Sequence, residues 1–225
     1  MSKVKLPNRI LPIKNKDKGF HEKWKEGRNK LNVVHPFRIL ALGPPGSGKS
    51  TIAKNILLRA NPPFEKVFII HCDPDYTQEY DDIAEGTDLE LLSEIPPPES
   101  WEGLVKTLVI LDDLEFKGMS KDQKRNLDRL FGYVSTHKKI SIILCSQDFH
   151  GAPTIVRRCA NMFILWKTPD LHSMATVASK TGLRAEDFHE LFTLCKNSKD
   201  SIWIDLTENS PYPLRLNGFE VINKD

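Results

Sequence analysis

The sequence predicts an α/β fold: an open, mainly parallel sheet flanked by helices, with a C-terminal β-hairpin. Short apolar runs alternate with amphipathic stretches from residue 36 to about residue 199, as strands joined by crossover helices do. Two further apolar runs then flank an Asn-Ser-Pro turn near the C-terminus. The chain has 225 residues, of which 40% are hydrophobic, so it suffices for one well-buried domain.

Five apolar runs are expected to form the parallel strands: residues 37–42, 66–72, 107–113, 140–145 and 162–166. The third and fourth runs are almost continuously apolar, as expected for strands buried on both faces. Residues 201–206 and 213–219 are expected to pair as the terminal hairpin.

Helical periodicity predicts helices over residues 49–60, 120–139, 170–181 and 185–196. The second is the clearest, because Ser120 and Gln123 fit a capping box that precedes an apolar stripe. The acidic stretch 73–102 is expected to be loop and short helix, because the prolines at 96–98 exclude a strand interior.

Charge divides the chain into a basic arm, residues 1–35, and a domain, residues 36–225. Residues 1–30 carry ten Lys and Arg against three acidic residues, whereas the net charge of the whole chain is +2. The arm suggests contact with a polyanion or a solvated tail, and the overall charge excludes a uniformly basic nucleic-acid coat. No signal-like segment and no apolar run near 18 residues is present, so we expect a soluble, non-secreted protein without a membrane partner.

The segment GPPGSGKST matches the motif G-x-x-x-x-G-K-[ST] between an expected strand and an expected helix. In such a phosphate-binding loop, or P-loop, backbone N–H groups surround phosphate oxygens, Lys49 reaches the β and γ phosphates, and Ser50 binds Mg²⁺. ATP and Mg²⁺ are therefore the expected cofactors. The predicted nucleotide-binding residues are Gly43, Pro44, Pro45, Gly46, Ser47, Gly48, Lys49, Ser50 and Thr51.

Asp112 and Asp113 close the run at 107–113, where a P-loop enzyme needs a carboxylate for Mg²⁺. Because neighbouring strand residues face opposite sides, we assign Asp112 to the Mg²⁺ shell and Asp113 to polarising the attacking water. Glu115 is an alternative base, and a turn-capping role is an alternative for Asp113.

The run at 140–145 is expected to lie between the P-loop strand and the strand at 107–113, as in P-loop ATPases with a catalytic acid. Gln147 would then meet the γ-phosphate and the lytic water at the carboxyl end of the sheet. Arg157 or Arg158, on a short helical segment, would act on a neighbouring subunit as an arginine finger. The plainer alternatives are a loop hydrogen bond for Gln147 and ordinary surface charge or an intrachain ion pair for the arginines.

The segments PFRILALGPPGSGKST, TLVILDDLEF, SIILCSQDF and APTIVRRCANMFILW resemble the genome-packaging ATPases of large eukaryotic DNA viruses and virophages, within the FtsK–HerA superfamily. The resemblance covers about residues 36–168 and implies a RecA-like P-loop NTPase of the ASCE type. It implies Walker A at Gly43–Thr51, Walker B at Asp112 and Asp113, a sensor at Gln147, and a trans-acting finger at Arg157 or Arg158. The superfamily often has Asp-Glu where this chain has Asp-Asp.

The resemblance also implies a ring of identical subunits that hydrolyses ATP to move double-stranded DNA into a preformed capsid. The implied partners are double-stranded DNA, further copies of the chain and a capsid or portal-vertex protein. The implied location is the cytoplasm or viral factory of an infected host cell, and also the virion. The basic helix face at 120–139 is a candidate DNA contact through phosphates rather than bases, or an ordinary solvated helix face. The basic arm is a candidate contact with DNA or with the capsid.

Other classes of function stay open from the residues. A small-molecule or nucleotide kinase would want an arginine-rich lid, and residues 168–200 hold no such cluster. A nucleotide-gated scaffold without enzymatic activity would keep Lys49 but gain nothing from Asp113 together with Gln147. A zinc site through His71, Cys72 and His150 is an alternative use of those side chains.

Overall fold

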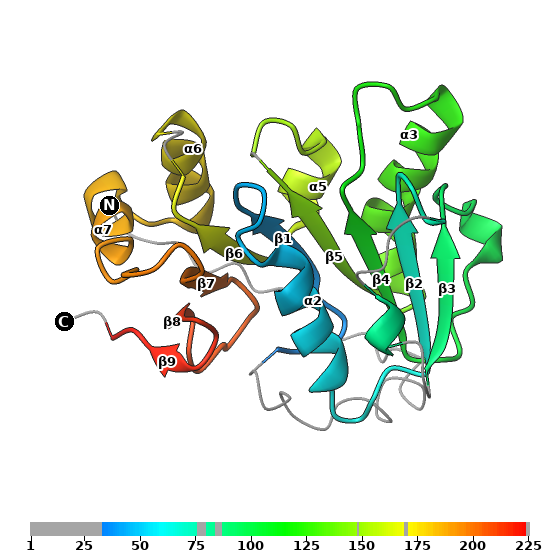
Figure 1. Ribbon diagram of the computed structural model, residues 1–225, viewed down its shortest axis with the longest axis horizontal. Coiled ribbons are helices and arrows are strands. Elements are labelled where there is room, and N and C mark those ends of the chain that lie inside the picture. The colour runs from blue at the N-terminus through cyan, green and yellow to red at the C-terminus, as the bar shows by residue number, and fades with distance from the viewer. Residues whose placement is uncertain (1–32, 76–79, 84–86, 148, 169–170, 224–225) are drawn as a thin grey trace, which may run out of the picture.

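The computed structural model describes residues 33–75, 80–83, 87–147, 149–168 and 171–223, and these residues form one nine-stranded sheet (Figure 1). The strands are β1 (Arg38–Leu42), β2 (Lys66–His71), β3 (Asp88–Leu92), β4 (Thr107–Asp112), β5 (Ser141–Ser146), β6 (Met162–Trp166), β7 (Ser201–Asp205), β8 (Leu214–Leu216) and β9 (Glu220–Val221). Most of the predicted basic arm lies outside the described residues. Near its end, Val33 is buried and His35 hydrogen-bonds the Ser141 hydroxyl at 2.7 Å.

The sheet runs in the order β3-β2-β4-β5-β1-β6-β7-β8-β9. Strands β1 to β6 pair in parallel, and β7 to β9 continue the sheet antiparallel. The prediction that the run at 140–145 separates the P-loop strand from the strand at 107–113 is confirmed, because β5 pairs with β1 on one side and β4 on the other. The carboxyl ends of β1, β4 and β5 therefore meet at one edge of the sheet.

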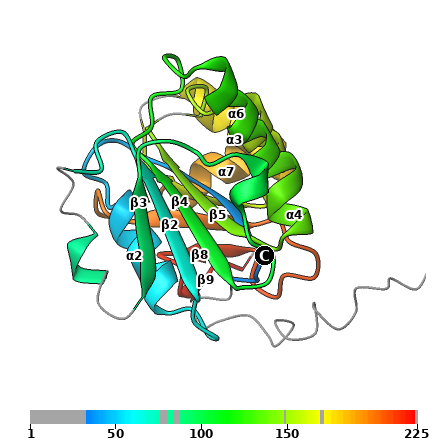
Figure 2. The ribbon, with the colours of Figure 1, turned by 90° about the vertical axis from the view of Figure 1, so that its right-hand side faces the viewer.

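Helices cover both faces of the sheet, and Figure 2 shows α2 on one face and α3, α4, α6 and α7 on the other. The helices are α2 (Lys49–Leu58), α3 (Lys121–Arg129), α4 (Ser135–His137), α5 (Thr154–Cys159), α6 (Leu171–Thr181) and α7 (Ala185–Leu191), with 3₁₀ turns at Asp81–Ile83 and Pro98–Ser100. None of the described helices is both long and apolar enough to cross a membrane.

Alternation along the strands divides the core into two clusters, one for each face. In β4, Leu108 and Ile110 belong to the cluster under α2, whereas Val109 and Leu111 belong to the cluster under α3 and α5. All four are fully buried, and burial of each such side chain contributes about 1.5–3 kcal/mol. The predicted burial of β4 on both faces is thus confirmed, and the sheet is a rigid support for the loops at its carboxyl edge.

The acidic stretch 73–102 differs from the expectation, because it contains a strand. β3 (Asp88–Leu92) pairs in parallel with β2 at the sheet edge. Asp88 is exposed, and Glu90, opposite Phe68 in the register, forms an ion pair of 2.9 Å with Lys66 across the strands. Leu89 and Leu91 pack against the cluster under α2. An edge strand tolerates this half-exposed alternation, which a loop assignment overlooks.

The helix predicted at 120–139 forms, but its interior is a π-helical turn at Leu130–Val134. Only half of the predicted capping box forms. The Ser120 hydroxyl accepts a hydrogen bond from the Gln123 backbone N–H, whereas the Gln123 side chain accepts one from the Ile95 N–H at 2.7 Å. Gln123 thereby fastens the proline-rich loop to α3. The last predicted helix is also shorter than expected, because α7 ends at Leu191.

Candidate functional site

The P-loop, Gly43–Thr51, connects the carboxyl end of β1 to α2, as the motif predicts. Gly46 and Gly48 adopt left-handed backbone angles, with φ of 69° and 108°, which side chains disfavour. Gly43 is needed for space, because a Cβ atom there would lie 2.9 Å from the Trp166 side chain. The three glycines therefore let the loop turn tightly while it packs against the end of β6.

Two lysines contact the P-loop backbone. The Lys49 Nζ, at the start of α2, donates hydrogen bonds to the carbonyl oxygens of Gly43 at 2.9 Å and Pro44 at 3.0 Å. The Lys199 Nζ donates to the carbonyl oxygen of Gly46. Sequence reasoning missed Lys199, because it lies 153 residues from Gly46 and no motif marks it.

A cavity of about 370 Å³ lies against the loop and these lysines. Its lining residues are Gly46, Gly48, Lys49, Ser50, Thr51, Lys54 and Lys199. Three are lysines and none is acidic, so the cavity favours anions. In the same loop, the buried Ser47 hydroxyl has no hydrogen-bond partner among the described residues. This lining and the N-terminus of α2 fit the phosphate groups of a nucleotide.

A larger cavity, of about 810 Å³, lies between the prolines at 96–98 and α3. Acidic and basic side chains line it together, among them Glu94, Glu99, Arg125 and Arg129. No P-loop residue contributes to it, so it is separate from the candidate nucleotide site.

Asp112, the last residue of β4, is buried on the face of the sheet that α2 covers. The Tyr80 hydroxyl donates a hydrogen bond to Asp112 Oδ2 at 2.5 Å, and the two residues are only 2% and 4% exposed. A hydrogen bond to a buried carboxylate is strong and fixes its orientation. Tyr80 was not predicted, because it lies in the acidic stretch without a motif around it.

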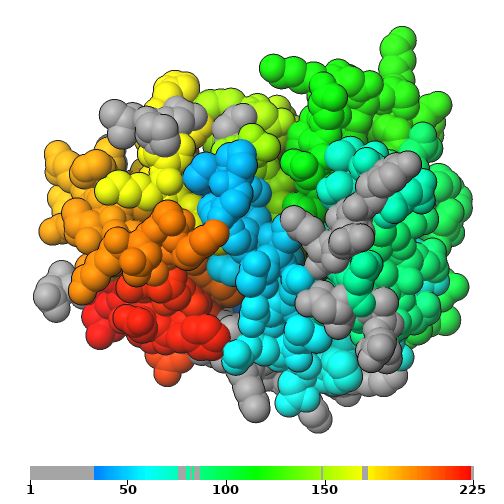
Figure 3. Space-filling model, in the orientation of Figure 1, coloured from blue at the N-terminus to red at the C-terminus, as the bar shows by residue number. Residues whose placement is uncertain are grey.

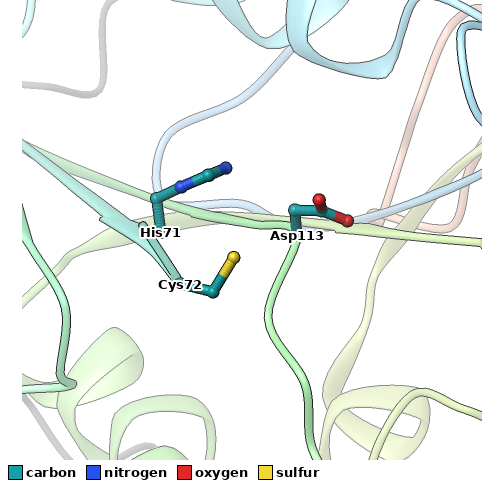
Figure 4. Close-up of side chains that lie close together, drawn as sticks. All are labelled: His71, Cys72 and Asp113. Atoms are coloured by element: carbon teal, nitrogen blue, oxygen red, sulfur yellow. The ribbon is translucent and has the colours of Figure 1, made fainter. Parts of the chain in front are cut away.

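Asp113 lies just beyond β4 and is exposed, with a left-handed φ of 52°. The strand alternation used to separate the two aspartates therefore does not apply to it. Figure 4 shows its carboxylate and the side chains of His71 and Cys72, at the end of the neighbouring β2, around one space. One donor atom from each of the three lies within 4.8 Å of the others.

The surroundings of His71 and Cys72 determine where each side chain carries its proton. The His71 Nδ1 accepts a hydrogen bond from the Asp73 backbone N–H at 3.0 Å, so the neutral ring carries its proton on Nε2. Burial, followed by the charges of Asp113 and Asp73, raises the pKa of the Cys72 thiol. Metal binding here would require His71 to give up its bond with Asp73 and Cys72 to lose its proton.

The zinc alternative at His71, Cys72 and His150 is wrong in its third member. His150 stacks on His172, with ring centroids 4.8 Å apart and planes inclined by 16°. Among the described residues, only Asp113 joins His71 and Cys72 in a group of potential ligands.

Gln147 follows β5 directly and is exposed. Its strand is tied to the P-loop, because the Gly43 N–H donates to the Ser146 carbonyl oxygen at 3.1 Å. Gln147 and Gly43 also line one small cavity together with Trp166. Gln147 does not line the lysine-rich cavity, so the structure brings it to the P-loop but not into the proposed phosphate site.

The adjacent arginines on α5 (Thr154–Cys159) have different surroundings. The Arg157 guanidinium lies 5.2 Å from the Phe149 ring centroid and donates to the Thr154 hydroxyl at 3.1 Å. Arg158 is exposed, and within the part of the chain that the structure describes its guanidinium has no hydrogen bond or ion pair. Arg157 is therefore held by contacts within the chain, although its buried Nε has no hydrogen-bond partner among the described residues, whereas Arg158 is exposed at the surface.

The sheet is mostly parallel, the P-loop follows β1, and β5 lies between β1 and β4. This is the fold of a P-loop NTPase, so the predicted fold class is confirmed.

The crystal structure of B204, the DNA-packaging ATPase from Sulfolobus turreted icosahedral virus, superposes on this chain with a TM-score of 0.57 at 16% identity. The match covers 81% of this chain and 98% of B204. The genome-packaging NTPase B204 from Sulfolobus turreted icosahedral virus 2 in complex with ATP-gammaS gives a TM-score of 0.56 at 12% identity, with coverage of 83% and 98%. Its sulfate complex gives 0.55 at 14%, with coverage of 80% and 95%. No protein-family model and no curated protein matches the sequence.

Proposed function

We propose that this chain is an ATP-hydrolysing motor that moves double-stranded DNA into a viral capsid. The observation that carries the proposal is the order of β1, β5 and β4, which brings the P-loop, Gln147 and two aspartates to one edge of the sheet. Hydrolysis by water needs a carboxylate and a polar group opposite the γ-phosphate. The similarity in fold to genome-packaging ATPases supports the choice of DNA as the polymer.

In this proposal, the lysine-rich cavity binds the phosphates of ATP. Lys49 exchanges its bonds to the Gly43 and Pro44 carbonyls for bonds to phosphate oxygens, which are stronger because the acceptor is charged. The Ser47 hydroxyl and the N–H groups at the start of α2 supply further donors.

Mg²⁺ would be held by the Ser50 hydroxyl and, through water, by Asp112, and it would neutralise charge on the phosphates. Tyr80 engages the Oδ2 atom of Asp112 and leaves Oδ1 for such a water. Tyr80 would therefore act as a positioning residue, through its hydrogen bond to Asp112.

Asp113 would take the proton of the attacking water, and its exposure leaves the carboxylate open to that water. Glu115, also exposed in the connection after β4, is the alternative base. Gln147 would orient the same water from the end of β5. Its lack of charge matters, because a lysine there would pair with Asp113 and suppress its basicity.

Arg158 would be the trans-acting finger and would act on the nucleotide of a neighbouring subunit in a ring. Its exposure and free guanidinium favour it over Arg157, whose contacts with Phe149 and Thr154 fix it within its own subunit. An arginine finger requires a neighbour, so the assignment also implies a homo-oligomer.

DNA would be contacted by basic residues of the helix predicted at 120–139. Four are exposed on α3: Lys121, Lys124, Arg125 and Arg129. Lys138 is not available, because its Nζ donates to the carbonyl oxygens of Pro98 and Trp101. Exposed lysines and arginines bind phosphates without reading bases, as a motor that moves along any sequence requires.

The test is the ATPase rate of the purified chain with and without double-stranded DNA. Stimulation by DNA is expected, with loss of activity in Lys49→Ala and in Asp113→Asn, while Asp113→Asn keeps nucleotide binding. Stimulation by a small phosphate acceptor instead of DNA would indicate a kinase. Nucleotide binding with no hydrolysis under any condition would indicate a non-enzymatic scaffold.

A further inference from the structure

We propose that Lys199 is a phosphate-binding residue of the nucleotide site, presented from the loop that precedes β7. Its ligand would be a nucleoside di- or triphosphate, which Lys199 would bind through the β or γ phosphate. The inference rests on the proposed nucleotide site but not on the DNA motor. It extends that site beyond the P-loop motif, to a residue near the opposite end of the chain.

The position of the Lys199 Nζ is the first argument. It donates to the Gly46 carbonyl oxygen, at the tip of the P-loop, and it lines the same cavity as Lys49 and Lys54. An ammonium group has three donors, so two stay available beside the contact with Gly46. A phosphate oxygen bound in this cavity would be a charged acceptor within the same region, which strengthens the bond relative to a neutral carbonyl.

The loop that carries Lys199 is well fixed, which is the second argument. Asp200 Oδ2 accepts hydrogen bonds from the backbone N–H groups of Lys196 at 2.8 Å and Asn197 at 2.9 Å. Asp200 Oδ1 accepts one from the Asn217 side chain at 3.0 Å. These bonds hold the loop in one conformation and attach it to the turn after β8. Little conformational entropy is therefore lost when Lys199 binds a phosphate.

A single side chain links this loop to the P-loop. The Trp166 indole N–H donates to the Lys199 carbonyl oxygen at 3.1 Å, and the same side chain occupies the space beside Gly43. Trp166 is 1% exposed, so the link is rigid. Figure 3 shows the orange surface of the segment near residue 200 meeting the blue surface of the P-loop region.

Electrostatics supply the third argument. Three lysines surround a cavity without an acidic lining residue, and a bound anion would lower their mutual repulsion. A contact of Lys199 with Gly46 alone would contribute little, because Lys199 is exposed and the net gain from such a hydrogen bond is about 1 kcal/mol or less. The arrangement therefore favours a polyphosphate as the second partner of Lys199.

The test is isothermal titration of the full chain with AMP, ADP and ATP-gammaS in the presence of Mg²⁺. Lys199→Ala is expected to raise the Kd for ADP and ATP-gammaS about tenfold, as loss of a charge-assisted bond predicts, and to leave AMP within about twofold. Lys199→Arg should recover most of the affinity. Lys196→Ala is the matched control, since it removes the same charge from the same loop outside the cavity.

Equal affinities of Lys199→Ala and Lys196→Ala for ADP and ATP-gammaS would overturn the proposal. Equal weakening of all three nucleotides would overturn it as well, because that pattern indicates a general disturbance of the loop. A chain that binds ATP-gammaS through Lys199 but never hydrolyses ATP would refute the motor and leave this inference standing.

Discussion

Replacing Tyr80 by phenylalanine removes only the hydroxyl that donates to Asp112. The ring is retained, so its packing in the cluster under α2 is unchanged and no cavity forms. The substitution removes the hydrogen bond of 2.5 Å to the Asp112 carboxylate, and both residues are nearly excluded from solvent. Hydrogen bonds to charged groups contribute about 1.5–3 kcal/mol. For a chain of this size, a loss of about 2 kcal/mol lowers Tm by about 4–8 °C.

Thermal unfolding of the Tyr80→Phe and Asp112→Ala variants and of the double variant measures this bond as a cycle. The two substitutions should be non-additive by about 1–2 kcal/mol. Tyr212→Phe is the control, because Tyr212 is 41% exposed, and it should leave Tm unchanged. Additive effects, or a Tyr80→Phe variant as stable as Tyr212→Phe, would refute the view that Tyr80 positions Asp112.

Three further outcomes follow from the structure. Gly43→Ala should destabilise the fold by about 1–3 kcal/mol through overpacking, whereas Gly132→Ala, with its nearest neighbour 3.7 Å from the new Cβ, should be neutral or stabilising in the same thermal melt. Burial, and then nearby Lys106, lowers the pKa of His35 to about 3. In the unfolded chain histidine titrates near 6.5, so below that pH the unfolded state binds more protons, and about 2 kcal/mol of stability should be lost by pH 5. In urea titrations, a His35→Asn variant should not show this loss of stability between about pH 7 and pH 5. Arg157→Ala should lower Tm, since it loses the contact with the Phe149 ring. Arg158→Ala should leave Tm unchanged but abolish ATPase activity, and part of the activity should return when this variant is mixed with subunits that lack the catalytic base. No recovery at any mixing ratio would count against a trans-acting finger.

The features predicted correctly from the sequence are those encoded by local patterns. The P-loop motif fixes a strand, a turn and a helix within a few residues, and Gly46 and Gly48 adopt the left-handed angles that such a turn needs. The continuous apolar runs of β4 and β5 identify strands buried on both faces. Their order in the sheet was predicted by comparison with P-loop ATPases that use a catalytic acid, and β5 does lie between β1 and β4.

The features that were missed depend on contacts between distant segments. Tyr80 and Asp112 are 32 residues apart, and Lys199 reaches Gly46 across 153 residues, so neither spacing forms a recognisable motif. β3 is a different case, because the alternation in its sequence DLELL was available as a signal. The neighbouring prolines and acidic residues outweighed it.

Asp113 shows a third kind of error. Alternation places Asp112 and Asp113 on opposite faces only if β4 continues through Asp113, whereas the strand ends at Asp112. The positive φ at Asp113 redirects the chain, and its carboxylate lies beside His71 and Cys72 instead. A backbone conformation that non-glycine residues seldom adopt cannot be read from an aspartate in a sequence.

Displacement of a triplex-forming strand from a linear duplex tests the proposal that ATP hydrolysis moves this protein along double-stranded DNA. The wild-type chain should release the third strand in the presence of ATP and Mg²⁺, after a delay that grows with the length of duplex before the triplex. Lys49→Ala and Asp113→Asn should release none. Hydrolysis of ATP by the wild-type chain without any release of the third strand, at concentrations that support oligomers, would contradict the claim.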